Sequence, residues 1–136
     1  MLPFSDVNLL AVLIAALAAF IIGYFWYGPI FGKAWMKELG LSDKGKPEHA
    51  GKSIAQGALN MLITAYVLGL LLVLIAPSSL GDALAFGVAA WLGLKATTEA
   101  SSVIWEKRTL KLFLINQVYE LFAVLIMVTI FMSWPA

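Results

Sequence analysis

Residues 7–27 read VNLLAVLIAALAAFIIGYFWY, and this stretch contains no Asp, Glu, Lys, Arg or His. About 20 apolar residues are the length that a helix needs to cross a hydrocarbon core of about 30 Å. Three further apolar stretches follow at residues 53–76, 83–105 and 110–131. The sequence therefore predicts an all-α membrane protein, with four transmembrane helices bundled in a single domain over residues 1–136.

The composition agrees with this prediction and excludes several classes of function. Hydrophobic residues make up 62% of the chain and charged residues 12%, against about 45–50% and about 25% in soluble domains. A formal net charge of +1 gives no basic patch for a nucleic acid. The chain has no cysteine and one histidine, His49, so we expect neither a metal site nor a cofactor.

The positive charges predict how the chain is oriented. Eight of the nine Lys and Arg residues fall in or beside two connections, at residues 28–52 and 107–111. Cytoplasmic loops are enriched in Lys and Arg, so this side is expected to face the cytoplasm. The sequence thus predicts a multi-pass protein of the cell (inner or plasma) membrane, with loop 28–52 in the cytoplasm and both termini outside.

A short amphipathic helix is expected after the first span. Phe31, Trp35 and Leu39 recur at every fourth position, while two lysines occupy another face. This pattern is typical of a helix that lies in the membrane interface. Gly40 is a suitable residue to end that helix, and Pro47 is expected to open a cytoplasmic extension of the second span.

Two motifs carry a resemblance to a known family. Residues 26–36 read WYGPIFGKAWM and residues 114–119 read LINQVY. Together they resemble the bacterial "domain of unknown function 1761" family of small four-helix membrane proteins, and the resemblance spans nearly the whole chain. It implies a bacterial inner-membrane protein of this architecture. It transfers no catalytic residue, because the family carries no established activity.

Small residues form two ridges at four-residue spacing. Close helix packing in lipid depends on such residues and on polar contacts. Each ridge could be a seam within the chain or an interface in a homo-oligomer, and we expect most of this surface to be intramolecular. The first ridge is Ala11, Ala15, Ala19 and Gly23, and the second is Ala85, Ala89, Gly93, Thr97 and Ser101.

Polar residues inside the spans fall at two depths. At a rise of about 1.5 Å per residue, Lys95 and Glu120 each lie about 15 Å from the cytoplasmic end of their span. Glu99 and Asn116 lie about 9 Å deep and Asn60 about 10 Å deep. Residues of this kind are costly in lipid, so they are expected to turn inward and pair.

We predict an ion pair between Lys95 and Glu120, with Glu99 held by Asn60, Asn116 and Tyr119. One lysine then faces two glutamates, and a buried carboxylate without a partner is costly. One glutamate is therefore protonated, or is neutralised by a cation or a basic ligand, or reaches water. The predicted intramembrane polar cluster comprises Lys95, Glu99, Asn116, Glu120, Asn60, Gln56 and Tyr119.

Three functions remain open. The first is an oligomeric transporter or channel for protons, cations or a small charged solute. The second is a non-catalytic scaffold or accessory subunit, whose polar cluster only holds helices together. The third is an enzyme acting on a lipid-soluble substrate, with Glu99 or Glu120 as acid–base and Tyr119 as proton donor. The enzyme ranks last, because the sequence contains no cofactor motif, metal cluster or phosphate loop.

Overall fold

The computed structural model describes residues 1–40 and 50–135, and every regular element within them is helical. The all-α class that the sequence predicts is therefore confirmed. The expected helix start at Pro47 and the single histidine, His49, lie outside the described residues.

The described residues form four long helical rods, whose ends lie at most three residues from those expected. In chain order the elements are a 3₁₀ turn η1 (Phe4–Asp6), α1 (Leu9–Phe25), a π-helical turn η2 (Trp26–Ile30), α2 (Gly32–Glu38), α3 (Ala50–Ile75), α4 (Leu80–Ala90), a second π-helical turn η3 (Trp91–Ala96), α5 (Thr97–Trp105) and α6 (Leu110–Ser133). The first rod consists of α1 and η2, the second is α3, the third consists of α4, η3 and α5, and the fourth is α6.

Local sequence determines several helix ends. The side chains of Asn8, Ser79 and Thr109 each accept a hydrogen bond from the backbone N–H three residues further on. Such a cap satisfies an N–H that has no partner within the helix. Beyond α2, Gly40 adopts a φ of 73°, a conformation that favours glycine, so the predicted end of this helix is confirmed.

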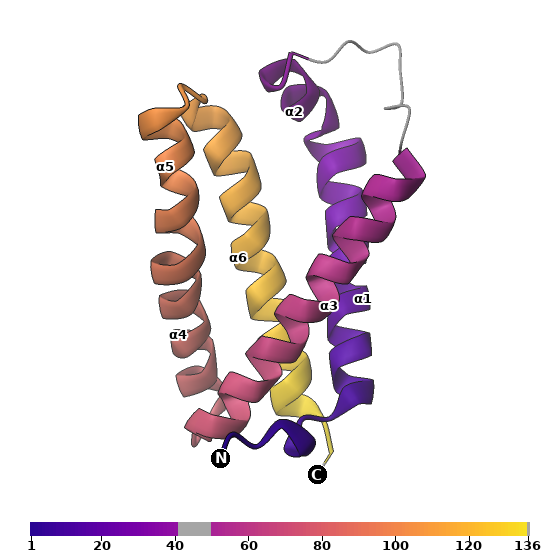
Figure 1. Ribbon diagram of the computed structural model, residues 1–136, viewed down its shortest axis with the longest axis vertical. Coiled ribbons are helices and arrows are strands. Elements are labelled where there is room, and N and C mark those ends of the chain that lie inside the picture. The colour runs from indigo at the N-terminus through magenta and orange to yellow at the C-terminus, as the bar shows by residue number, and fades with distance from the viewer. Residues whose placement is uncertain (41–49, 136) are drawn as a thin grey trace.

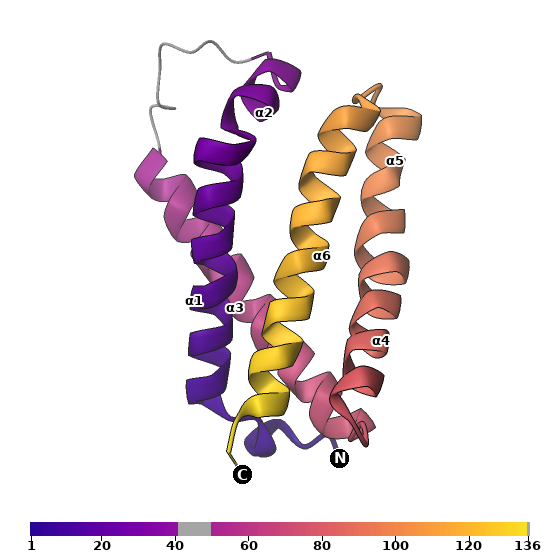
Figure 2. The same ribbon diagram turned by 180° about the vertical axis from the view of Figure 1, so that it is seen from behind.

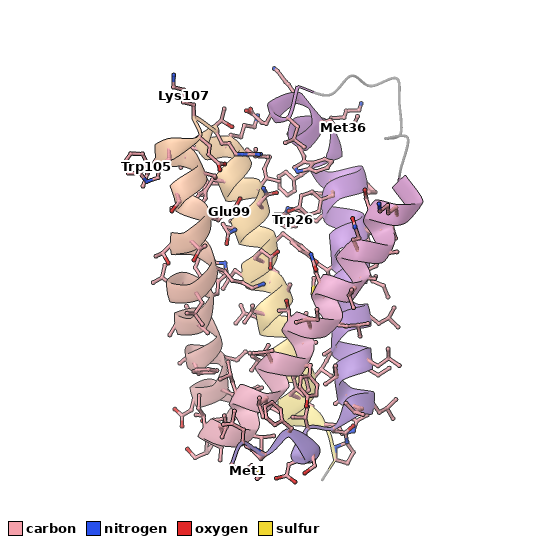
Figure 3. The ribbon with its side chains drawn as sticks, in the orientation of Figure 1. Met1, Trp26, Met36, Glu99, Trp105 and Lys107 are labelled. Carbon is pink, nitrogen blue, oxygen red and sulfur yellow. The ribbon has the colours of Figure 1, made fainter. Side chains whose placement is uncertain are left out.

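The helix α6 lies in the middle of the molecule. Figures 1 and 2 show α1 on one side of it and α4 and α5 on the other, while α3 crosses it obliquely. Both termini lie at one end, which we call the terminal end (Figure 1). The opposite end, with α2 and the α5–α6 turn, is called the cationic end because Lys107 lies there, far from Met1 (Figure 3).

The terminal half is closely packed through small residues. Ala11, Ala15 and Ala19 are each 0% exposed, and a Cβ on Gly69 would lie 2.9 Å from the ring of Phe131. The first ridge is thus a seam within the chain, as expected. The same expectation is wrong for the second ridge, because all five of its residues are exposed on the outer face of the α4–η3–α5 rod.

Three helices in the described parts of the chain are long and apolar enough to cross a membrane: Leu9–Ile30, Gly51–Ile75 and Leu110–Ser133. Large apolar side chains on them face outward, for example Leu13 and Leu17, each 53% exposed. The α4–η3–α5 rod is not among these helices. It carries Asp82, Lys95 and Glu99, and the η3 turn interrupts its α-helical hydrogen bonding.

Candidate functional site

A cavity of about 740 Å³ occupies the cationic half of the molecule. Its walls come from α1, η2, α2, α3 and α6, and η3 contributes Lys95. It runs from Tyr119 and Glu120, midway along α6, to Trp35 on α2 and Arg108 in the α5–α6 turn. The cavity therefore leads from the cationic end to the middle of the molecule.

The position of the cavity follows from side-chain size along α1. Alanines line the terminal half of this helix, whereas Phe20, Tyr24 and Tyr27 follow toward the cationic end and line the cavity. Large side chains hold neighbouring helices apart, and small ones let backbones approach. As a result, α1 and α6 are close at the terminal end and diverge toward the cationic end (Figures 1 and 2).

Lys95 and Glu120 meet on the wall of this cavity. Lys95 Nζ lies 2.5 Å from Glu120 Oε2, and the two side chains are 29% and 28% exposed. These are the two groups that the sequence places at equal depth. The pair does not lie in a dry core, because both residues line the cavity. A solute that enters the cavity can reach both charges.

The π-helical turn η3 presents Lys95 to the cavity. At its end, Thr97 N donates to Leu92 O, five residues back, instead of to the usual carbonyl four residues back. The hydroxyl groups of Thr97 and Thr98 then donate to the carbonyl oxygens of Gly93 and Leu94, at 2.8 and 3.0 Å. π-Helical turns of this kind occur frequently at functional sites, since they change the direction of the following side chains.

The other π-helical turn, η2, joins the two sequence motifs, residues 26–36 and 114–119. Trp26 Nε1 donates to Ile115 O at 2.9 Å, and Tyr27 Oη donates to Asn116 Oδ1 at 2.8 Å. The ring centroids of Tyr27 and Tyr119 are 5.3 Å apart. The two motifs are 89 positions apart at these hydrogen bonds, yet they contact each other beside the cavity.

Tyr119 anchors α6 to α1. It is 6% exposed, and its hydroxyl group donates to Ala19 O at 2.8 Å. The ring passes close over Gly23, where a Cβ would lie 2.9 Å from Tyr119 Oη. The hydroxyl group of Tyr119 is therefore used within the chain, which leaves it no proton to donate to a substrate in this arrangement.

This close approach predicts a large effect of one added methyl group. Gly23→Ala is expected to lower the free energy of unfolding by about 1–3 kcal/mol, as overpacking of a filled site does. Gly28→Ala is the matched control, because its Cβ would meet no atom within 4 Å; it should change stability by less than about 0.5 kcal/mol. Thermal unfolding of the purified variants in detergent measures both. Equal losses would contradict the contact between Gly23 and Tyr119.

The remaining members of the predicted cluster are divided between cavity and surface. Asn60 and Gln56 are both exposed, but Asn60 lines the cavity and Gln56 lies outside it. Glu99 is partly buried and is not part of the cavity lining. Among the described residues, its carboxylate forms none of the expected hydrogen bonds, and the Oδ1 of Asn116 accepts from Tyr27 Oη. Glu99 lies in the cationic half, with Trp26 (Figure 3).

The helix α2 turns its apolar face toward the protein. Trp35 and Leu39 line the cavity, and the ring of Phe31 lies 4.5 Å from that of Trp26. At the end of α2, Thr109 Oγ1 donates to Glu38 Oε2 at 2.7 Å. These contacts place α2 beside the cavity opening and tie it to the start of α6. The apolar face that suggested a membrane-interface helix is thus largely used in contacts within the chain.

Some residues of the site lie outside the polar cluster that the sequence predicts. Thr64 lines the cavity beside Lys95, and Arg108 lies at its cationic end. Gln117 is 6% exposed, and its Oε1 has no hydrogen-bond partner among the described residues. The second motif contains Gln117, so the resemblance was the one signal that pointed to it. Trp91 Nε1 donates to the backbone carbonyl of the same residue at 2.9 Å.

Comparison with known proteins supports the resemblance. No curated protein and no solved structure matches the chain. The family described as "Protein of unknown function (DUF1761)" matches residues 10–132. This range includes both motifs, the Lys95–Glu120 pair and all four long helical rods except their outermost residues. The chain belongs to the DUF1761 family.

Proposed function

We propose that this protein is a small multi-pass membrane transporter, whose cavity admits a small charged solute to the Lys95–Glu120 pair. The observation that carries the proposal is the place of this pair on the wall of a 740 Å³ cavity. Charged groups inside membrane segments are costly and typically mark pathways for substrates, ions or protons. A pair that served only to hold helices together would be better placed in a closed core.

The size and lining of the cavity support a solute rather than a bare ion. Binding sites for small molecules typically have volumes of about 300–1,000 Å³, with mainly apolar and aromatic walls and a few polar groups. This cavity matches that description, with Phe20, Tyr24 and Trp35 among its aromatic residues. Lys95 and Glu120 supply the charges at the inner end of the cavity, and we propose that Glu120 also takes up and releases protons during transport.

The proposed topology has four spans, with the cationic end in the cytoplasm. Three helices are long and apolar enough to cross, yet both termini lie at the same end (Figure 1). A chain whose termini share one side must cross an even number of times. The α4–η3–α5 rod, which runs beside α6 (Figure 2), is then the fourth span. Its polar residues are tolerated because Lys95 pairs with Glu120 inside the bundle.

Single cysteines test access to the cavity, because the native chain contains none. Asn60→Cys, on the cavity wall, should react with a charged, membrane-impermeant thiol reagent in inside-out vesicles and not in intact cells. Leu59→Cys is the matched control: Leu59 is 57% exposed on the outer face of α3 and lies outside the cavity, so lipid should keep it unreactive. Ser79→Cys, in the α3–α4 turn, should react in intact cells.

Two other outcomes of the Asn60→Cys experiment would change the proposal. Reaction of Asn60→Cys in intact cells alone would reverse the orientation. No reaction of Asn60→Cys from either side would mean that the cavity is closed to water-soluble molecules. The transport proposal would then be abandoned in favour of a scaffold.

A further inference from the structure

A second, apolar recess meets the cavity at Lys95. It is a lateral groove of about 320 Å³ between α3 and the α4–η3 segment, with Val124 of α6 behind it. Thr64 and Lys95 line both the groove and the cavity. In Figure 1, α3 crosses in front of α6 and leaves the α4–η3 side of the bundle uncovered at this level. The groove therefore connects the outer face of the bundle to the ion pair.

The groove opens where lipid would surround the protein. Ile63, Val67 and Leu94 line it and are 55%, 46% and 69% exposed. Apart from Thr64, Lys95 and the indole N–H of Trp91, its lining side chains are apolar. The indole N–H already donates to Gln117 O. Lys95 is thus the charged group that a molecule in the groove would meet.

The charges around the groove favour an anion over a cation. The groove reaches Lys95 and not Glu120. Arg108, at the cationic end of the cavity, is half exposed and pairs with Glu106, so it takes no part at the groove. A charge removed from water requires a partner of opposite sign, so a charged ligand in the groove that binds Lys95 must be an anion.

We propose that the ligand is a carboxylic acid with a single apolar chain. Its chain lies in the lateral groove, and its carboxylate binds Lys95 at the junction with the cavity. This inference rests on the proposed function and specifies the solute. The ligand reaches the site from the bilayer, because the groove and not only the cationic end gives access to Lys95.

Binding then exchanges one carboxylate for another. The acid arrives protonated, its O–H bond breaks, and the proton is taken up by the Glu120 carboxylate as a new O–H bond. The ligand carboxylate replaces Glu120 as the partner of Lys95. The net charge of the site is unchanged, which avoids the cost of an uncompensated charge in a low-dielectric environment.

Quenching of tryptophan fluorescence tests this proposal, since Trp91 lines the groove. The probe is 11-bromoundecanoate, whose bromine quenches nearby indoles, added to purified protein in nanodiscs. We expect saturable quenching that is lost in Trp91→Phe. The methyl ester of the same acid and 11-bromoundecylammonium have similar chains without the negative charge, so neither should give the saturable component.

Variants of the ion pair should shift the apparent affinity in opposite directions. Lys95→Met removes the partner of the carboxylate and should abolish saturable quenching. Glu120→Gln removes the competitor for Lys95 and should tighten binding at least several-fold. The double variant leaves no uncompensated charge and should behave as Lys95→Met does. It therefore distinguishes a loss of binding from misfolding of the single variant.

A variant pair in α4 tests the location. Ala90 lines the groove, whereas Ala89 lies next to it on the exposed ridge. Ala90→Phe should weaken the saturable quenching, and Ala89→Phe should preserve it. Equal quenching by acid, ester and ammonium would show that the groove merely accommodates lipid chains. If no probe binds while Asn60→Cys remains reactive, the carboxylate inference is wrong and the proposed transport cavity stands.

Discussion

Lys95→Met and Glu120→Gln should each destabilise the protein more than the double variant does. Each single substitution leaves one partly buried charge on the cavity wall without the partner that lies 2.5 Å away. Removing one member of a buried pair is strongly unfavourable, whereas removing both leaves a neutral site. We expect a coupling energy of about 0.5–3 kcal/mol. Reversible unfolding of the four proteins in detergent provides the double-mutant cycle.

The chain offers a matched control for this cycle. Arg108 Nε and Glu106 Oε2 are 3.4 Å apart, with side chains 50% and 64% exposed, so water screens this second pair. The same cycle with Arg108→Met and Glu106→Gln should give no more than about 1 kcal/mol. Strictly additive losses at Lys95 and Glu120 would mean that the two groups do not interact in the folded protein.

Glu120→Gln should abolish proton exchange by the protein in liposomes. Glutamine keeps the size and the hydrogen-bonding capacity of the side chain, but it has no ionisable group that could take up or release a proton. Wild-type protein in sealed liposomes is expected to dissipate an imposed pH gradient faster than empty vesicles do. The Glu120→Gln protein should match the empty vesicles while it remains folded, because Glu120 is the carboxylate on the cavity wall.

Glu99→Gln is the matched control for this measurement. Glu99 lies on α5 in the same cationic half of the molecule, but it does not line the cavity. Its substitution should leave the flux unchanged. Loss of flux in Glu99→Gln, with flux retained in Glu120→Gln, would place the exchanging group elsewhere. A wild type no faster than empty vesicles would contradict proton exchange at this site.

Periodicity and hydrophobicity determine the helices without knowledge of the fold. Most of residues 7–27, from Leu9 on, and all of residues 110–131 are helical in the structure, because long apolar runs in lipid must satisfy their backbone groups internally. The contact between Lys95 and Glu120 also agrees with the equal depths of these residues along their helices. A rise of about 1.5 Å per residue is enough to align groups across neighbouring spans.

The tertiary structure alone decided which polar groups share a site. Regular helical spacing places Glu99 on the face of Lys95, but the π-helical turn η3 changes the hydrogen bonding between Trp91 and Ala96 and with it the directions of nearby side chains. Lys95 then lines the cavity, and Glu99 does not. Depth counted along straight helices cannot include such a local change.

The cavity itself also depends on packing that no single helix contains. The first ridge of small residues is tightly packed and the second is exposed, although both have the same four-residue spacing in the sequence. The difference depends on which helices are neighbours in the fold. Phe31, Trp35 and Leu39 form an apolar face that would suit lipid or protein equally well. Only the position of α2 in the fold, where Thr109 of the α5–α6 turn donates to Glu38, directs Trp35 and Leu39 to the cavity and Phe31 to Trp26.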